Sequence, residues 1–193
     1  MKRSILALAA LALLICGASA VHADTITITE TATMSGSLDG VSFTNALVTF
    51  TVVADPANSS NGGAGTTFRL PGVTTVTVAG ITDTLSDAST GAVVNQGSGL
   101  AGISDFTTHI GLLFTIDPAA FDTYTLMSSI GPVSGNSEVS IFDFATDNGS
   151  LDLSSAGQAT FTAVETTPEP GTIAMFGIGL AGILVLMKKK ALA

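Results

Sequence analysis

The sequence predicts an all-β fold: a single β-sandwich or jelly-roll-like extracytoplasmic domain over residues 24–166. Two observations predict it. Runs of β-branched residues, several of them alternating with period two, recur along this segment and are separated by turn-forming dipeptides. No stretch between these runs sustains the 3.6-residue periodicity of an amphipathic helix. About 140 residues suffice for one domain with a sizeable core.

The first expected strand, residues 25–29, alternates strictly between Thr and Ile, as a strand with one buried face does. Further strands are expected at residues 46–53, 73–79, 109–116, 123–127, 138–144 and 158–164. Turns are expected at 39–40, 61–63, 71–72, 117–118, 131–132 and 148–149, where Gly, Pro, Asn and Asp gather. The Asn148-Gly149 pair predicts a hairpin between residues 141–144 and 151–153.

Residues 1–23 have the organisation of a secretory signal peptide. Lys2 and Arg3 precede an uninterrupted apolar run at residues 5–15, and small residues follow. We expect signal peptidase to cut between Ala23 and Asp24, with Ala20 as the other candidate position. Cleavage after Ala23 would remove Cys16, the only cysteine, so the exported chain would have neither disulfides nor thiol chemistry.

The charge of the central segment is strongly acidic. Residues 24–166 contain 14 acidic side chains and one cation, Arg69, which gives a formal net charge of −13. This balance excludes nucleic acid as a partner, because phosphate contacts need Lys and Arg. A surface of this charge also favours solubility and discourages edge-to-edge strand pairing.

Little in the sequence indicates catalysis, and we expect a protein that is not an enzyme and has no cofactor. His109 is the only histidine after residue 23, and no nucleophile-elbow motif surrounds any serine. One histidine without cysteine makes a zinc site of the usual type improbable. A carboxylate pair for glycoside hydrolysis stays open, although the absence of Trp and the single Tyr124 disfavour a sugar-binding cleft.

The sharpest metal hypothesis concerns Asp143, Asp147, Asn148 and Asp152, which cluster around one expected turn. Carboxylate and amide oxygens are ligands that suit Ca²⁺. The spacing is not that of an EF-hand loop. An acidic surface turn without a metal is the more common origin of such a cluster.

The last 27 residues combine three segments in order. Pro168-Glu169-Pro170 is stiff and extended, because each proline fixes φ and removes a backbone donor. An uncharged apolar run at about residues 171–187 follows, and as a helix it would span roughly 25 Å, near the ~30 Å of a bilayer core. Lys188, Lys189 and Lys190 then form a basic stop. Their charge predicts a transmembrane helix with the lysines in the cytoplasm and residues 24–166 outside.

This order of motif, apolar helix and basic cluster resembles the PEP-CTERM sorting signal over residues 167–190, a family of Gram-negative bacteria that make extracellular polymer. The resemblance implies that an exosortase, an integral membrane enzyme, recognises Pro168, Glu169 and Pro170 and removes the tail. These residues would then be a substrate site. One departure is that the basic cluster here is all Lys, whereas Arg is common in the family.

Two functions follow as expectations. The first is an exported, non-enzymatic surface or extracellular-matrix protein, with secretion machinery, exosortase, the membrane and extracellular polysaccharide as partners. Its precursor would be anchored in the membrane with the domain outside the inner membrane. The protein would then reach the cell surface or the extracellular space. The alternative is a small acidic carbohydrate- or Ca²⁺-binding module, or a hydrolase, anchored at the membrane.

Overall fold

The computed structural model describes residues 24–62, 66–87, 89–140 and 142–166. The predicted signal peptide, the Pro168–Pro170 motif, the expected transmembrane helix at 171–187 and Lys188–Lys190 lie outside these ranges. Among the described residues, the structure contains no helix with the length and apolar character needed to cross a bilayer.

The all-β prediction is confirmed. Within the described ranges, twelve strands follow one another, and a 3-10 turn, η1 (Pro56–Asn58), and a four-residue helix, α2 (Pro118–Phe121), lie between them. The strands are β1 (Thr25–Leu38), β2 (Val41–Ala54), β3 (Ser60–Asn61), β4 (Thr67–Pro71), β5 (Val73–Val78), β6 (Ile81–Thr84), β7 (Thr90–Asn95), β8 (Leu100–Asp105), β9 (Ile110–Ile116), β10 (Ile130–Val139), β11 (Asp143–Ala145) and β12 (Ser150–Thr166).

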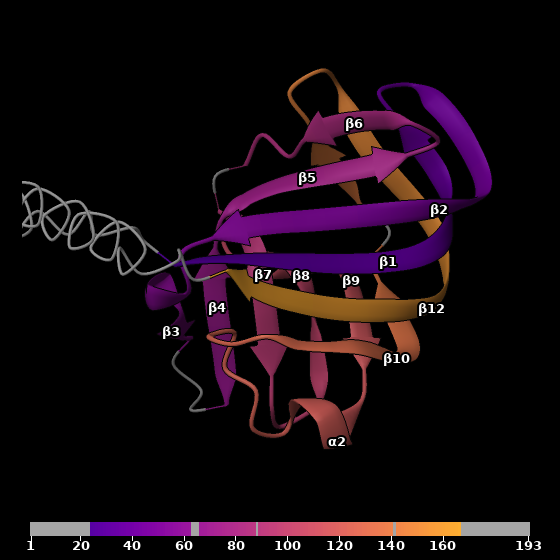
Figure 1. The fold of residues 1–193 in the computed structure, drawn as a ribbon. Coiled ribbons are helices and arrows are strands. Elements are labelled where there is room, and N and C mark those ends of the chain that lie inside the picture. Colours follow the sequence, from indigo (N-terminus) through magenta and orange to yellow (C-terminus); the bar gives the residue numbers. More distant parts are fainter. Residues whose placement is uncertain (1–23, 63–65, 88, 141, 167–193) are drawn as a thin grey trace, which may run out of the picture. The chain divides into compact units, whose positions relative to one another are not determined.

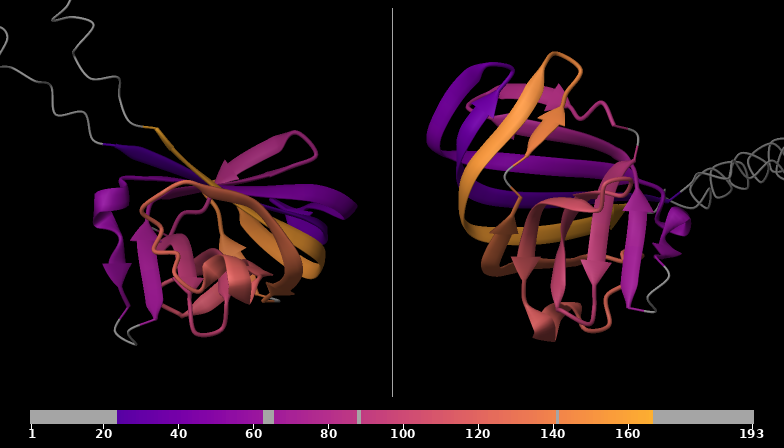
Figure 2. Two further views of the ribbon diagram at one scale, coloured as in Figure 1. Left: turned by 60° about the horizontal axis from the view of Figure 1, so that its bottom comes forward. Right: turned by 180° about the vertical axis from the view of Figure 1, so that it is seen from behind.

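All strands belong to one antiparallel sheet, in the order β3-β4-β7-β8-β9-β10-β12-β1-β2-β5-β6, with β11 paired to β12. The sheet is continuous because β10 pairs with β12 through its first half and with β9 through its second half. Figures 1 and 2 show the result: β1, β2, β5 and β12 cross over β4, β7, β8 and β9. The sandwich prediction expected two separate sheets; the structure instead curls one sheet so that its two halves face each other.

Two tight turns join neighbouring strands into hairpins. Asp39 and Gly40 join β1 to β2 with φ values of 53° and 79°, and Ala79 and Gly80 join β5 to β6 with φ values of 50° and 84°. Positive φ at both central residues is the geometry of a type I′ turn, whose twist matches that of antiparallel strands. The Asp39-Gly40 turn agrees with the sequence prediction, and so does the hairpin around Asn148-Gly149, where Phe144 pairs with Leu151.

The core lies between the two halves of the curled sheet. Alternate residues of β1, β2, β5 and β12 point into it, which explains the period-two pattern of the sequence. Phe161 packs edge-on against Phe121 at 5.5 Å and against Tyr124 at 6.0 Å between ring centroids. The four-residue helix α2 therefore delivers an aromatic side chain that closes one end of the core.

Five strands, β3, β4, β6, β7 and β8, were missed from sequence. Only the last two residues of β10 lie within a predicted strand, that at 138–144, and the turn predicted at 131–132 falls inside β10. The strand predicted at 123–127 is absent. β7 (TGAVVN) and β8 (LAGISD) contain Gly and Ala, which interrupt the pattern of β-branched residues from which the other strands were predicted. Their small residues are needed for close packing: a Cβ on Gly91 would lie 2.3 Å from the Leu70 carbonyl oxygen, and one on Gly102 would lie 2.1 Å from that of Leu113. Residues 123–127 form no strand, and His109 (φ 59°) lies in the turn before β9.

Glu30 is a buried carboxyl in the middle of β1, with no exposed surface. Its Oε1 accepts a 2.5 Å hydrogen bond from the Thr115 hydroxyl of β9, while Oε2 has no partner among the described residues. Burial raises the pKa of Glu30 well above its ordinary value, and the Thr115 bond offsets only part of that rise. Glu30 is therefore held protonated over a wider pH range than an exposed glutamate.

Glu30→Gln should make unfolding less dependent on pH. The favourable contribution of the protonated Glu30 is complete below the unfolded pKa of ~4.3. It is lost as pH rises through the raised folded pKa, at up to about 1.4 kcal/mol per pH unit between the two values. We expect urea unfolding to show the variant gaining stability over wild type between pH 4 and pH 8. A constant difference across that range would contradict the assignment.

Candidate functional site

Asp83 is the most heavily hydrogen-bonded carboxylate of the region around the predicted Asn148 turn. It lies on β6, is 5% exposed, and faces inward. Its Oδ1 accepts from the Thr84 backbone N–H at 2.8 Å and from the Asn148 side-chain Nδ2 at 2.9 Å, and its Oδ2 accepts from the Asn148 backbone N–H at 3.0 Å. Burial acts to raise the pKa of Asp83, but these donors together hold it below its ordinary value.

The loop between β11 and β12, which contains Asn148, is tied to two other elements. The Asp147 backbone N–H donates to the Thr84 carbonyl at 3.0 Å, and the Thr146 hydroxyl donates to Asp39 Oδ1 at 2.7 Å. Thr146 also forms a bridge with Leu85. The loop between β11 and β12 is thus fastened both to β6 and to the β1–β2 turn, so its polar side chains serve to hold these segments together.

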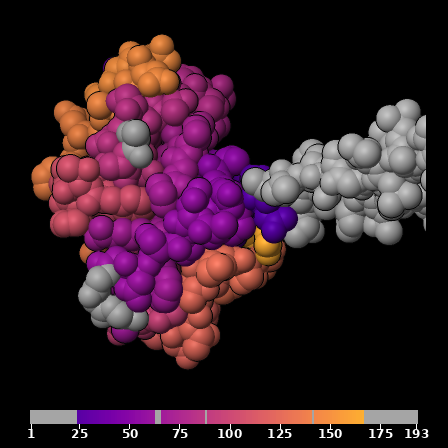
Figure 3. All heavy atoms as spheres, turned by 90° about the vertical axis from the view of Figure 1, so that its left-hand side faces the viewer, coloured from indigo at the N-terminus to yellow at the C-terminus, as the bar shows by residue number. Residues whose placement is uncertain are grey.

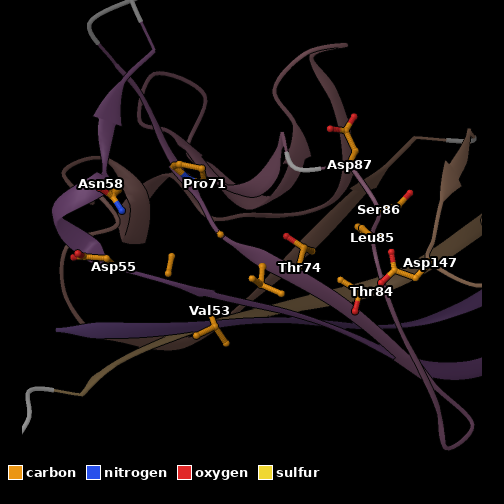
Figure 4. Close-up of a pocket in the computed structure, with 13 residues that line it drawn as sticks. Val53, Asp55, Asn58, Pro71, Thr74, Thr84, Leu85, Ser86, Asp87 and Asp147 are labelled. Atoms are coloured by element: carbon orange, nitrogen blue, oxygen red, sulfur yellow. The ribbon is translucent and has the colours of Figure 1, made fainter. Parts of the chain in front are cut away.

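An open groove of about 640 Å³ lies beside this loop. Figure 4 shows Asp55 and Asn58 at one end, Asp87 and Asp147 at the other, and the apolar Val53 in between. A smaller cavity of about 120 Å³ shares Leu85 and Asp87 with the groove. Three carboxylates line the groove without a cation among its lining residues, so its electrostatic field disfavours an anionic ligand.

The four residues of the calcium hypothesis do not share one centre. Asp143 and Asp152 face each other as a cross-strand pair on β11 and β12, Asp147 borders the groove, and Asn148 bonds to Asp83. Within residues 24–166, apart from the short undescribed gaps, no three His, Cys, Asp or Glu side chains gather where they could hold a metal ion. The calcium site therefore stays a prediction without geometric support.

Sequence reasoning missed Asp83, the partner of Asn148. The available signal was its position in Thr82-Asp83-Thr84, where strand alternation places the aspartate on the core side. The separation of 65 positions between Asp83 and Asn148 explains why proximity in sequence could not reveal the pair.

His109, the candidate base considered from sequence, is exposed. Its Nδ1 lies 3.3 Å from an Arg69 guanidinium nitrogen, and that guanidinium also lies 5.6 Å from the Phe106 ring centroid. The recorded neighbour of His109 is thus a cation, whereas a catalytic triad places a carboxylate and a nucleophile beside its histidine.

Asp83→Ala should lower the melting temperature by several degrees, because it leaves the Asn148 amide and two backbone donors without their acceptor. Asp152→Ala is the matched control: it removes the same charge from an exposed position on β12 and should change the melting temperature little. Differential scanning calorimetry of the two variants checks this. Equal melting temperatures would show that the loop is not held through Asp83.

The two ends of the described segment lie together. Thr25 of β1 pairs with Thr166 of β12, and the Thr166 hydroxyl donates to the Thr25 carbonyl at 3.1 Å. Figure 3 shows these ends side by side, in indigo and yellow. Asp24, the expected mature N-terminus, is exposed at this position. Ala23, Pro168, Glu169, Pro170 and Lys188–Lys190 are outside the described residues.

Comparison with known families decides the nature of the tail. Residues 166–190 match the model of the PEP-CTERM protein-sorting motif. The chain carries a PEP-CTERM sorting signal. This signal implies an exported protein whose membrane-anchored precursor is processed by an exosortase. No match was found among curated proteins or among solved structures. The match begins at Thr166, the last residue of β12, so the PEP-CTERM signal starts where the sheet ends.

Proposed function

We propose that this chain is a non-enzymatic surface or extracellular-matrix protein, released or attached at the cell surface after an exosortase removes its PEP-CTERM tail. The proposed location of the protein is the extracellular polysaccharide around the cell. The observation that carries the proposal is the sorting motif at residues 166–190. A signal peptide over residues 1–23, a transmembrane helix at about 171–187 and cytoplasmic Lys188–Lys190 complete the proposed precursor.

The position of the motif supports removal of the tail. The sheet ends at Thr166, and the pairing of Thr166 with Thr25 is made within the domain. Cleavage near Pro168–Pro170 would remove no sheet hydrogen bond recorded for residues 24–166. A domain that keeps its fold after the cut can serve as the delivered product, whereas the tail acts only as an address.

Two features of the domain support a role other than catalysis. The recorded contacts of His109 are with Arg69, and the carboxylate of Asp83 is engaged by three hydrogen bonds that stabilise a loop. Neither group is arranged to move a proton to a substrate. The acidic, cation-poor surface suits a hydrated extracellular setting.

The mature termini test the proposal. The chain would be produced in its native host, and intact mass and peptide mapping would be measured on the membrane and extracellular fractions. We expect a product that begins near Asp24 and ends near Pro168–Gly171. A product that retains Lys188–Lys190 in all fractions would overturn the sorting function and leave a single-span membrane protein.

Calcium should not change the melting temperature of the domain, because Asp143, Asp147, Asn148 and Asp152 do not converge. Scanning calorimetry in EDTA and in millimolar Ca²⁺ measures this, with Mg²⁺ as the ionic-strength control. A Ca²⁺-specific rise that is lost in Asp147→Ala would favour the alternative function, a small Ca²⁺-binding module.

A further inference from the structure

The outer face of the sheet carries a regular block of threonines. Five adjacent strands, β12, β1, β2, β5 and β6, each contribute a Thr-x-Thr pair. Their registers align the pairs into two rows. The first row is Thr162, Thr29, Thr51, Thr75 and Thr84, and the second is Thr160, Thr31, Thr49, Thr77 and Thr82. We call these ten residues the threonine array.

The array faces away from the core. The residues between the two rows are Phe161, Glu30, Phe50, Val76 and Asp83, all buried on the opposite side of the sheet. Because successive side chains of a strand point to opposite faces, the threonines must point outward. Their side chains are half-buried or, at Thr82, exposed.

Most of the array hydroxyls are available to a ligand. Thr77 and Thr82 share a 2.8 Å hydrogen bond across β5 and β6, and Thr160 shares one of 2.8 Å with Ser134 of β10. Within the described segments, the structure records no hydrogen bond for the other seven hydroxyls, which include those of Thr29 and Thr51 at the centre. Each of these seven threonines therefore presents a hydroxyl without a recorded partner next to a methyl group.

The array positions carry no charge, although the domain is strongly acidic and Thr84, at one end of the array, also borders the groove that Asp55, Asp87 and Asp147 line. None of the 14 acidic residues of segment 24–166 occupies an array position, and neither does Arg69. Aliphatic side chains continue the face beyond the rows: Val53, Val73 and Val164 on one side and Leu47 on the other are 45–63% exposed. The charge pattern fits a neutral surface as the occupant, since a charged one would lack a partner.

The array repeats in two dimensions. Neighbouring strands lie ~4.8 Å apart, and same-face residues recur every ~6.7 Å along a strand. A surface of ice presents water oxygens in a neutral two-dimensional repeat of similar scale. Hydroxyls held in rows can take the place of lattice waters, while the adjacent methyl groups exclude mobile water. We propose that the threonine array is an ice-binding surface.

The central strands carry the binding. Sheets twist by roughly 20–25° between neighbouring strands, so a rigid plane meets only a few of them at once. β12, β1 and β2 place six threonines in a continuous block at the middle of the face. A neutral polysaccharide is disfavoured, because ligand sites for ring-shaped molecules rely on aromatic side chains, and no array position holds one.

Partition into slowly growing ice tests the inference. The full-length chain, in mild non-ionic detergent, would be frozen onto a cold finger together with an inert acidic reference protein. We expect wild type to enter the ice at least several-fold more than the reference. Thr51→Tyr should abolish this enrichment, because the bulky ring would hold the neighbouring threonines of both rows away from the ice. Thr51→Val, which keeps the shape and removes the hydroxyl, should reduce it.

Thr123→Tyr is the matched control. It makes the same change at an exposed threonine after α2, outside the array, and should leave partition unchanged. Circular dichroism and melting curves identify any variant that does not fold. Exclusion of wild type from ice, or equal enrichment of wild type and Thr51→Tyr, overturns the proposal. Loss of self-association or of polysaccharide binding in Thr51→Tyr without ice enrichment overturns it as well. The result is independent of tail processing.

Discussion

Replacing Pro168-Glu169-Pro170 by three alanines should leave the tail on the chain. The PEP-CTERM match covers these residues, and alanines would remove both the extended backbone set by the prolines and the carboxylate between them. We expect intact mass in the native host to shift from a processed product to a precursor that retains Lys188–Lys190 in the membrane fraction.

Replacement of Lys188, Lys189 and Lys190 by arginine is the matched control. It keeps the basic stop and its charge, so processing and fractionation should match those of the parent chain. Equal tail removal in the triple-alanine variant would show that Pro168–Pro170 are not the recognition residues. Failure of both variants would point instead to a general defect in export.

Phe161→Ala should destabilise the domain by about 3–5 kcal/mol, the usual range for removing a fully buried aromatic side chain. Phe161 has no exposed surface and contacts both Phe121 and Tyr124, so the deletion would leave a cavity in the core beside these two rings. This loss is a large share of the stability of a typical domain. Urea unfolding measured by circular dichroism gives the change in free energy.

Phe142→Ala supplies the control, because Phe142 is 54% exposed and its truncation leaves no internal cavity. We expect a change within about 0.5 kcal/mol, as for most surface substitutions. If Phe161→Ala were equally mild, the packing of α2 against β12 could not be the element that closes the core.

Local sequence signals predicted the elements whose stability is local. Alternation in residues 25–29 reflects a strand with one buried face, and Asp39-Gly40 adopts the positive φ values of its turn. The PEP-CTERM signal is also contained in a short continuous segment, residues 166–190. Such features are readable because the residues that determine them are neighbours in the chain.

Features that depend on distant contacts escaped prediction. β7 and β8 escaped prediction because each contains a glycine, Gly91 or Gly102, that close strand packing requires and that interrupts the local strand pattern. The predicted calcium residues diverge because β11 and β12 form a hairpin that sets Asp143 opposite Asp152 and turns Asn148 toward Asp83. The candidate groove likewise gathers residues from several separate segments.

By itself, then, the sequence determined the sorting address, the all-β class and the acidic, cysteine-free character of the central segment, because composition and short motifs carry these properties. The tertiary structure alone decided that one sheet curls over itself, since β10 divides its hydrogen bonds between β9 and β12. It also decided that Thr-x-Thr pairs from five strands align into one array without charged positions. Register between strands far apart in the chain is set by long-range pairing and core packing, which no local pattern contains.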